Sequence, residues 1–139
     1  MWADPLEYNR QVDDTLELDT VLRPSAALTN LLSRIDRTRV KTWILTNAYI
    51  THANRVLKLL DVERFFDGMS PALFANLLNL LGVTYCDYGQ EILICKPKPE
   101  MYYKAMMEAG VNDKRKCFFV DDSQSTPLTL LAFVMLMAS

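Results

Sequence analysis

The sequence predicts an α/β protein, a Rossmann-like three-layer sandwich with a parallel sheet between two layers of helices. Two observations favour this class. Short apolar runs rich in β-branched and aromatic residues alternate with longer segments of helical periodicity. Several of these runs end abruptly in polar residues, which is typical of strands whose carboxyl ends form a ligand-binding edge. We expect one domain in residues 1–139, because this length suffices for a single core.

The first half of the chain is expected to contain a helix, a strand and a second helix, over residues 25–35, 40–45 and 50–60. The strand is predicted from its apolar run, which ends in Ile44-Leu45. The second helix is predicted from the apolar spacing of Val56, Leu59 and Leu60. This order of elements is typical of a parallel sheet.

The second half is expected to contain two strands, a helix and a third strand, over residues 83–86, 92–95, 100–109 and 116–120. Pro97 and Pro99 favour the start of the helix, and Gly110 favours its end. The last strand is the clearest, because the apolar run through Val120 stops at two adjacent acids. Strands that alternate with helices indicate helices on both faces of the sheet.

Asp121 and Asp122 follow this last strand directly. Two neighbouring carboxylates repel each other unless a cation or a shared proton relieves them, and Mg²⁺ prefers such oxygen ligands. The alternative is that the two acids cap a helix or begin a turn. The pair therefore predicts a metal site or a cap.

Polar residues also follow two earlier apolar runs. Thr46 and Asn47 stand between the first strand and its helix, where a hydroxyl and an amide can help backbone N–H groups to hold an anion. Lys96 follows the run over residues 92–95 and would place a positive charge for a phosphate at the sheet edge. Each residue has a simpler interpretation, as a helix cap or a surface lysine. Their order, hydroxyl, lysine and paired acids, favours a phosphate site.

These residues resemble three motifs of the haloacid dehalogenase (HAD) superfamily. Thr46-Asn47, Lys96-Pro97 and Phe119-Val120-Asp121-Asp122 look like its second, third and fourth motifs. Residues 43–49 and 84–88 are similar to the fungal pyrimidine 5′-nucleotidases in particular. The resemblance covers roughly residues 4–68 and 83–123.

The resemblance implies a Mg²⁺-dependent phosphomonoesterase acting on pyrimidine nucleoside 5′-monophosphates. In that family an aspartate attacks the phosphate, and water then cleaves the aspartyl-phosphate. By resemblance, Thr46 and Asn47 would bind phosphate oxygens. Lys96 matches the catalytic lysine of the family's third motif and would neutralise the phosphate and the nucleophile. Asp121 and Asp122 would hold Mg²⁺. Positioning and cations are what phosphoryl transfer chiefly needs.

The family's first motif, Asp-x-Asp after an apolar strand, does not occur in these 139 residues. Asp13 and Asp14 are adjacent rather than alternate, and they lie in residues 1–23, which resemble the segment after the family's cap. The sheet is therefore expected to lack its first core strand, and most of the cap is missing. Covalent catalysis needs its nucleophile, so we expect this chain to be inactive as a phosphatase. An Asp-x-Asp motif encoded upstream would mark a truncated gene product.

Two stretches depart from the family pattern. Residues 69–82 interrupt it, and their removal restores the family sequence. We interpret them as a translated retained intron, with an amphipathic helical insertion as the alternative. Residues 124–139 are a divergent tail in which positions 128–138 are almost wholly apolar, too short to cross a bilayer. This tail is predicted to pack as a buried helix or strand, or to be further read-through sequence.

The bulk properties predict an intracellular domain, cytoplasmic or nuclear. The net charge is −2 with no sustained basic stripe, so we expect no nucleic acid partner, and no secretory leader or membrane span is predicted. The three cysteines Cys86, Cys95 and Cys117 are expected to be reduced, buried thiols. His52 is expected to be a solvated helix residue, with a substrate-binding or structural role like that in the family as the alternative. Composition does not predict the oligomeric state.

Three functions compete at this point. The first is the HAD-type nucleotidase described above, with a nucleoside monophosphate as its small-molecule partner. The second is a non-catalytic remnant that binds phosphate or Mg²⁺ through the same residues. The third, a receiver-like phosphoacceptor, is excluded by motif order, because receivers carry the acidic pair on their first strand. The residues do not predict base specificity, because most of the cap is absent.

Overall fold

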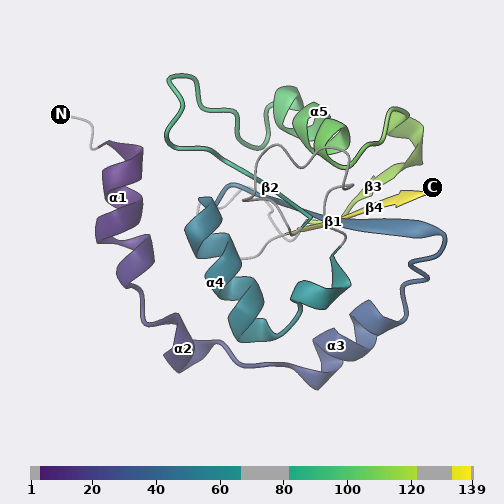
Figure 1. Ribbon diagram of the computed structural model, residues 1–139, viewed down its shortest axis with the longest axis horizontal. Coiled ribbons are helices and arrows are strands. Elements are labelled where there is room, and N and C mark those ends of the chain that lie inside the picture. Colours follow the sequence, from purple (N-terminus) through teal and green to yellow (C-terminus); the bar gives the residue numbers. More distant parts are fainter. Residues whose placement is uncertain (1–3, 67–81, 122–132, 139) are drawn as a thin grey trace.

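A computed structural model describes residues 4–66 and 82–121, together with the backbone of residues 133–138. In Figure 1 a sheet lies between two groups of helices, with α5 (Pro99–Glu108) on one side and α3 (Ala26–Ser33) and α4 (Ile50–Leu60) on the other. The α/β class with three layers is therefore confirmed.

The sheet has four strands in the order β2-β1-β4-β3. Their bounds are Val40–Thr46 for β1, Val83–Tyr85 for β2, Cys117–Phe119 for β3 and Phe133–Ala138 for β4. β1 pairs with β2 in parallel, as expected. β4 runs antiparallel to both β1 and β3, so the sheet is mixed rather than wholly parallel. Two antiparallel pairings in succession make β3 run in the same direction as β1.

The apolar tail explains this difference. Its residues 133–138 form β4, which confirms the strand alternative for that part of the tail. β4 pairs with β1 over six residues, from Val40↔Ala138 to Leu45↔Phe133. The sequence predicted a sheet without its first core strand, whose neighbours would expose unpaired backbone groups. β4 supplies those partners to β1 and β3, so a segment from the end of the chain completes the sheet between them.

The remaining helices lie in the N-terminal part of the chain: α1 (Pro5–Gln11) and α2 (Leu18–Val21). Local capping explains two of the helix starts. The Asp4 carboxylate accepts a hydrogen bond from Leu6 N at 3.0 Å before α1, and the Ser25 hydroxyl accepts one from Leu28 N at 3.3 Å before α3. Gly110 follows α5 with φ of 72°, the left-handed conformation that ends many helices.

The core has one cluster on each face of the sheet, because successive residues of β1 point to opposite faces. Trp43 and Leu45 are fully buried and pack against Met101 and Ala105 of α5. Ile44 packs on the other face in a cluster formed by α3, α4 and β2, whose buried members are Leu32, Ala53, Leu57, Val62, Phe66 and Val83. β1 is thus held from both sides, which fixes the position of its carboxyl end.

The prediction of a strand over residues 92–95 is wrong. These residues form an irregular segment with Ile92 at the surface, and Cys95 is joined by a disulfide to Cys86, with their Cα atoms 5.2 Å apart. The expectation of three reduced thiols is therefore also wrong, since only Cys117 is free. A four-residue apolar run does not distinguish a strand from other structure, and here the bridge and local turns take its place.

His52 is buried in α4, with 5% of its surface exposed, so the prediction of a solvated residue is wrong. The helix turns this side chain inward beside Ala53 and Val56, which are buried as well. The expectations for residues 69–81 and 124–132 lie outside the described residues.

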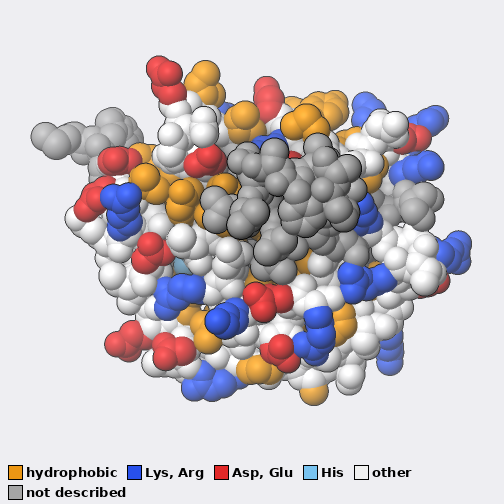
Figure 2. Space-filling model, viewed as in Figure 1, with side chains coloured by type: hydrophobic (Ala, Val, Ile, Leu, Met, Phe, Trp, Pro, Cys, Tyr) orange, Lys and Arg blue, Asp and Glu red, His pale blue; other side chains and the backbone are white. Residues whose placement is uncertain are grey.

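Acidic and basic side chains are interspersed on the face of the molecule shown in Figure 2. Within the part of the chain that the structure describes, no helix has both the length and the apolar character needed to cross a membrane.

Candidate phosphate site at the sheet edge

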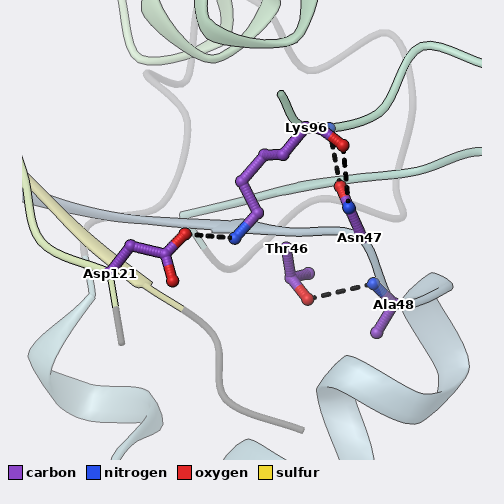
Figure 3. Close-up of polar contacts among 5 residues, drawn as sticks. All are labelled: Thr46, Asn47, Ala48, Lys96 and Asp121. Atoms are coloured by element: carbon purple, nitrogen blue, oxygen red, sulfur yellow. Dashed lines mark hydrogen bonds and ion pairs between the residues drawn. The ribbon is translucent and has the colours of Figure 1, made fainter. Parts of the chain in front are cut away.

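The carboxyl ends of β1, β2 and β3 lie at one edge of the sheet, because these three strands run in the same direction. Thr46 is the last residue of β1, and Asp121 follows β3 by two residues. Lys96 reaches this edge from the segment between β2 and α5, without being on a strand itself. The structure thus brings together four of the five residues that the sequence singled out: Thr46, Asn47, Lys96 and Asp121 (Figure 3).

Lys96 and Asp121 form an ion pair, with Nζ and Oδ2 3.0 Å apart. Both side chains are largely buried, with 10% and 16% of their surfaces exposed. The Lys96 ammonium also lies 5.5 Å from the centre of the Phe119 ring, an arrangement that stabilises a cation. The lysine charge is therefore held in one place, 25 residues away in sequence from its carboxylate partner.

Asn47 fixes the backbone of Lys96. Its Oδ1 accepts a hydrogen bond from Lys96 N at 2.7 Å, and its Nδ2 donates to Lys96 O at 3.1 Å (Figure 3). These two bonds tie the lysine-bearing segment to the end of β1. The side-chain amide that the sequence suggested for phosphate oxygens is thus bonded to protein backbone, which makes Asn47 a positioning residue.

Thr46 is 5% exposed, and its Oγ1 accepts a hydrogen bond from Ala48 N at 3.0 Å. A hydroxyl that accepts one hydrogen bond keeps its own hydrogen as a donor. Thr46 ends β1, the strand that Asn47 joins to the segment of Lys96 (Figure 3). The edge therefore combines a hydroxyl with a fixed ammonium, two groups that suit phosphate oxygens.

The donor set fits Mg²⁺ only in part within the described residues. Asp121 supplies carboxylate oxygens, the ligand type that Mg²⁺ prefers, and Mg²⁺ commonly uses one or two carboxylates together with substrate phosphate. The residues that the structure describes contain no group of three or more His, Cys, Asp or Glu side chains able to hold a metal. Asp122, the second predicted ligand, lies outside the described residues.

Aromatic residues around the edge were not predicted. Tyr88 donates a hydrogen bond from its hydroxyl to Asn47 O at 2.8 Å. Its ring stacks on the ring of Tyr49, with the ring centres 5.6 Å apart. Burial, followed by the charge of Asp13, raises the pKa of Tyr88, so its hydroxyl keeps its proton at neutral pH. Tyr88 lies in the segment 84–88 that resembles the nucleotidases, but its contact with Asn47 was not predicted, because it spans 41 positions.

On the other side of the site, Tyr102 of α5 packs edge-on against Phe119, with ring centres 5.3 Å apart. Burial raises the pKa of Tyr102, and the nearby charge of Asp121 raises it further. The two rings shield the side of the Lys96–Asp121 pair that faces α5, and lower polarity there strengthens the ion pair.

The fold is of the α/β class, and comparison with known proteins gives its family. The family model described as haloacid dehalogenase-like hydrolase matches residues 2–125, so the chain belongs to this family. Among curated proteins it is similar to Phosphate metabolism protein 8 of Saccharomyces cerevisiae, with 32% identity over 139 residues. The alignment covers 95% of this chain and 39% of the yeast protein, so the chain spans well under half of that relative.

Proposed function

We propose that this chain carries the phosphate-binding part of a Mg²⁺-dependent phosphomonoesterase site. The observation that carries the proposal is the largely buried Lys96–Asp121 pair at the carboxyl edge of the sheet, the edge at which β1 ends in Thr46. Family membership supports it, since the matched family is one of hydrolases. A largely buried ammonium held by a carboxylate, at an edge that also carries a hydroxyl, suits a small anion with several oxygens.

Each residue has a distinct role in this proposal. Lys96 would attract the phosphate and neutralise part of its charge, and Thr46 would donate its hydroxyl hydrogen to a phosphate oxygen. Asn47 would act indirectly, by holding the backbone of Lys96 through its two hydrogen bonds. Such fixed charges and dipoles stabilise a phosphoryl group without having to reorganise during reaction.

Mg²⁺ would be held by Asp121 and Asp122 together with phosphate oxygens. When bound, the ion would supply positive charge to the phosphoryl oxygens. Asp121 already contacts Lys96, so its carboxylate would be shared between an ammonium and a metal ion. Lys96 would then be released in part from Asp121 and be more available to the phosphate.

The substrate class proposed is a nucleoside 5′-monophosphate, with a pyrimidine base. It is supported by the resemblance of residues 43–49 and 84–88 to the pyrimidine 5′-nucleotidases. The yeast relative's name refers to phosphate metabolism, which is compatible with this class. The roles proposed for the described residues at the edge concern the phosphate and not the base, so the base preference rests on the resemblance alone.

We further propose that the 139-residue chain by itself does not turn substrate over. Its sequence contains no Asp-x-Asp motif to supply the attacking carboxylate. Enzymes accelerate phosphate-monoester hydrolysis by up to ~10²¹-fold, and binding groups alone do not approach this. The property to measure on this chain is therefore binding. A non-catalytic phosphate-binding protein is the second candidate, and the same absence favours it.

The decisive experiment measures binding of inorganic phosphate by calorimetry to the wild type and to Lys96→Met. We expect the variant to bind at least about tenfold more weakly, a loss of ~1.4 kcal/mol. Lys114→Met, which removes an exposed charge before β3, at the end of that strand away from the site, is the matched control. Equal weakening in both variants would show that net charge, rather than this site, binds phosphate.

The metal is tested by repeating the titration with Mg²⁺ and with Asp121→Asn. Mg²⁺ should tighten phosphate binding to the wild type and leave Asp121→Asn unchanged. Without Mg²⁺, Asp121→Asn should bind phosphate at least as tightly as the wild type, because Lys96 loses its competing partner. Hydrolysis of uridine 5′-monophosphate by the wild-type chain would contradict the proposed inactivity.

A further inference from the structure

A disulfide lies directly beside the lysine of the phosphate site. Cys86 is fully buried and follows the last residue of β2, and Cys95 is the residue before Lys96. The bridge joins residues nine apart in sequence. It therefore ties the lysine-bearing segment to the end of β2, in addition to the hydrogen bonds that tie it to Asn47 after β1.

The ring closed by this bridge, residues 86–95, is held by side-chain contacts rather than by strand pairing: Ile94 packs against the core cluster of α5, and Lys98 Nζ donates to Leu93 O at 3.0 Å. Within it, Asp87 accepts hydrogen bonds from Gly89 N at 3.0 Å and from the Gln90 side chain at 2.9 Å, both local contacts. Tyr88 reaches outward to Asn47 O at 2.8 Å. The ring also lines a cavity of about 530 Å³, whose lining residues are Asp87, Gln90, Glu91, Ile92, Ile94 and Lys104.

No strand pairing supports residues 92–95 among the described residues, and Ile92 is 74% exposed. The position of Cys95 is set by its covalent bond to a buried residue at the end of β2, together with a hydrogen bond from Lys98 N to Cys95 O at 2.9 Å. A disulfide restricts the conformations open to such a segment, and its loss restores that freedom. Without the bridge, the segment around Lys96 would be held by non-covalent contacts alone, among them those with Asn47 and Asp121.

We propose that the Cys86–Cys95 disulfide is a redox switch that sets the affinity of the Lys96 site for phosphate. The oxidised form holds Lys96 against Asn47 and Asp121, and the reduced form binds phosphate more weakly. This inference rests on the proposed function, since it regulates the same site. The switch itself is the coupling between the bridge and the position of the segment around Lys96.

The redox step needs a dithiol reductant or a thioredoxin-type protein dithiol. A thiolate of the reductant attacks Cys95 Sγ, the half-buried sulfur, and the bond to Cys86 Sγ breaks. The second thiol of the reductant then releases Cys95. Two electrons and two protons pass to Cys86 and Cys95, which become thiols, and the reductant becomes a disulfide. Attack on Cys86 is disfavoured because that residue is fully buried.

The test compares oxidised and reduced wild-type chain. Under denaturing conditions without reductant, the oxidised form should show one reactive thiol, Cys117, and the reduced form three. Inorganic phosphate should bind to the reduced form about tenfold more weakly, within the range typical of coupled sites. Cys95→Ser should behave like the reduced form with or without reductant. Cys117→Ser is the matched control and should respond to reductant as the wild type does.

Hydrogen exchange of a peptide covering residues 90–98 gives a readout that does not depend on phosphate. We expect faster exchange in the reduced form and in Cys95→Ser. Faster exchange without phosphate binding in either state would overturn the proposed function, and with it the effect on affinity, while supporting the coupling between the bridge and the segment around Lys96. Three reactive thiols in protein purified under air would overturn the switch. Equal exchange and equal phosphate affinity in the two states would overturn it as well.

Discussion

The side-chain amide of Asn47 and the backbone of Lys96 form a closed pair of hydrogen bonds, at 2.7 Å and 3.1 Å, across 49 positions of the chain. This pair joins the end of β1 to the segment that carries the positive charge of the site. Lys96 in turn contacts Asp121 beyond β3. The geometry of the site therefore depends on an asparagine that need not touch the phosphate.

Asn47→Ala removes both hydrogen bonds to Lys96. We expect a loss of about 1–2 kcal/mol in the free energy of unfolding, together with weaker phosphate binding, because Lys96 is no longer held. Asn47→Asp keeps the acceptor for Lys96 N and should lose less stability. Chemical denaturation and calorimetry with phosphate measure the two effects. Asn112→Ala, an exposed asparagine after α5, is the control, and an equal effect there would contradict the role of Asn47.

Thr84→Val should destabilise the core around β1. The Thr84 hydroxyl accepts a hydrogen bond from Trp43 Nε1 at 2.9 Å and donates one to the Glu108 carboxylate, and both Thr84 and Trp43 are fully buried. Valine keeps the shape but leaves these groups unpaired, at a cost of about 1–3 kcal/mol. Thr84→Ser keeps the hydroxyl and should cost less. Urea denaturation of Thr84→Val within error of the wild type would refute this assignment.

Glu108 predicts a pH dependence of stability. Burial raises its pKa above the ordinary value of 4.5, although the Thr84 hydroxyl and Lys104 act in the opposite direction. The folded chain therefore holds the Glu108 proton at pH values where the unfolded chain has released it. Stability from this group falls as the pH rises above 4.5 towards the raised pKa.

Glu108→Gln should remove this fall. Its free energy of unfolding, relative to the wild type, should increase between pH 4 and pH 7, as measured by denaturation at several pH values. Glu100→Gln, exposed at the start of the same helix, controls for the loss of one negative charge. A constant difference between Glu108→Gln and the wild type over this range would count against the prediction.

Gly110→Ala should destabilise the end of α5 without any steric clash. Gly110 has φ of 72°, and a Cβ there would meet nothing within 4 Å. The cost is therefore conformational, about 1–2 kcal/mol. Gly110→Asn should cost less, because asparagine tolerates this backbone conformation. Thermal and urea denaturation test whether the alanine variant loses more stability than the asparagine variant, and equal losses would contradict the prediction.

Leu136→Pro tests the pairing of β4 between β1 and β3. Residue 136 pairs with Thr42 on one side and Phe118 on the other. Proline has no amide hydrogen and does not fit inside a central strand, so we expect a loss of at least about 2 kcal/mol. The amides of residues 42–45 should then exchange faster. Leu136→Val keeps the amide and should leave their exchange unchanged, and protection retained in the proline variant would exclude this pairing.

The regular elements with strong local patterns were predictable. The strand through Leu45 and the helix over residues 50–60 have the bounds expected to within one residue, because burial of their apolar side chains is encoded in their periodicity. Residues 92–95 were not predictable from a run of four apolar side chains. Their conformation depends on the Cys86 partner supplied by another part of the chain.

For the site, residue types and their order along the chain were enough to single out Thr46, Asn47, Lys96 and Asp121. Parallel strand ends meet at one edge, so local sequence implies their proximity. The partners within that edge depend on side chains 25 to 49 positions apart, which no local pattern encodes. This is why the sequence did not predict the two hydrogen bonds by which Asn47 holds Lys96.

The amino-acid sequence by itself determined the α/β class, most of the helices and strands, and the chemical types gathered at the sheet edge, because these follow from periodicity and short-range order. Only the tertiary structure decided which residues pair across the edge, that Cys86 and Cys95 are bridged, and that β4 enters the sheet antiparallel between β1 and β3. The backbone N–H and C=O groups of a buried strand need hydrogen-bond partners, and the tertiary fold decides which segment supplies them.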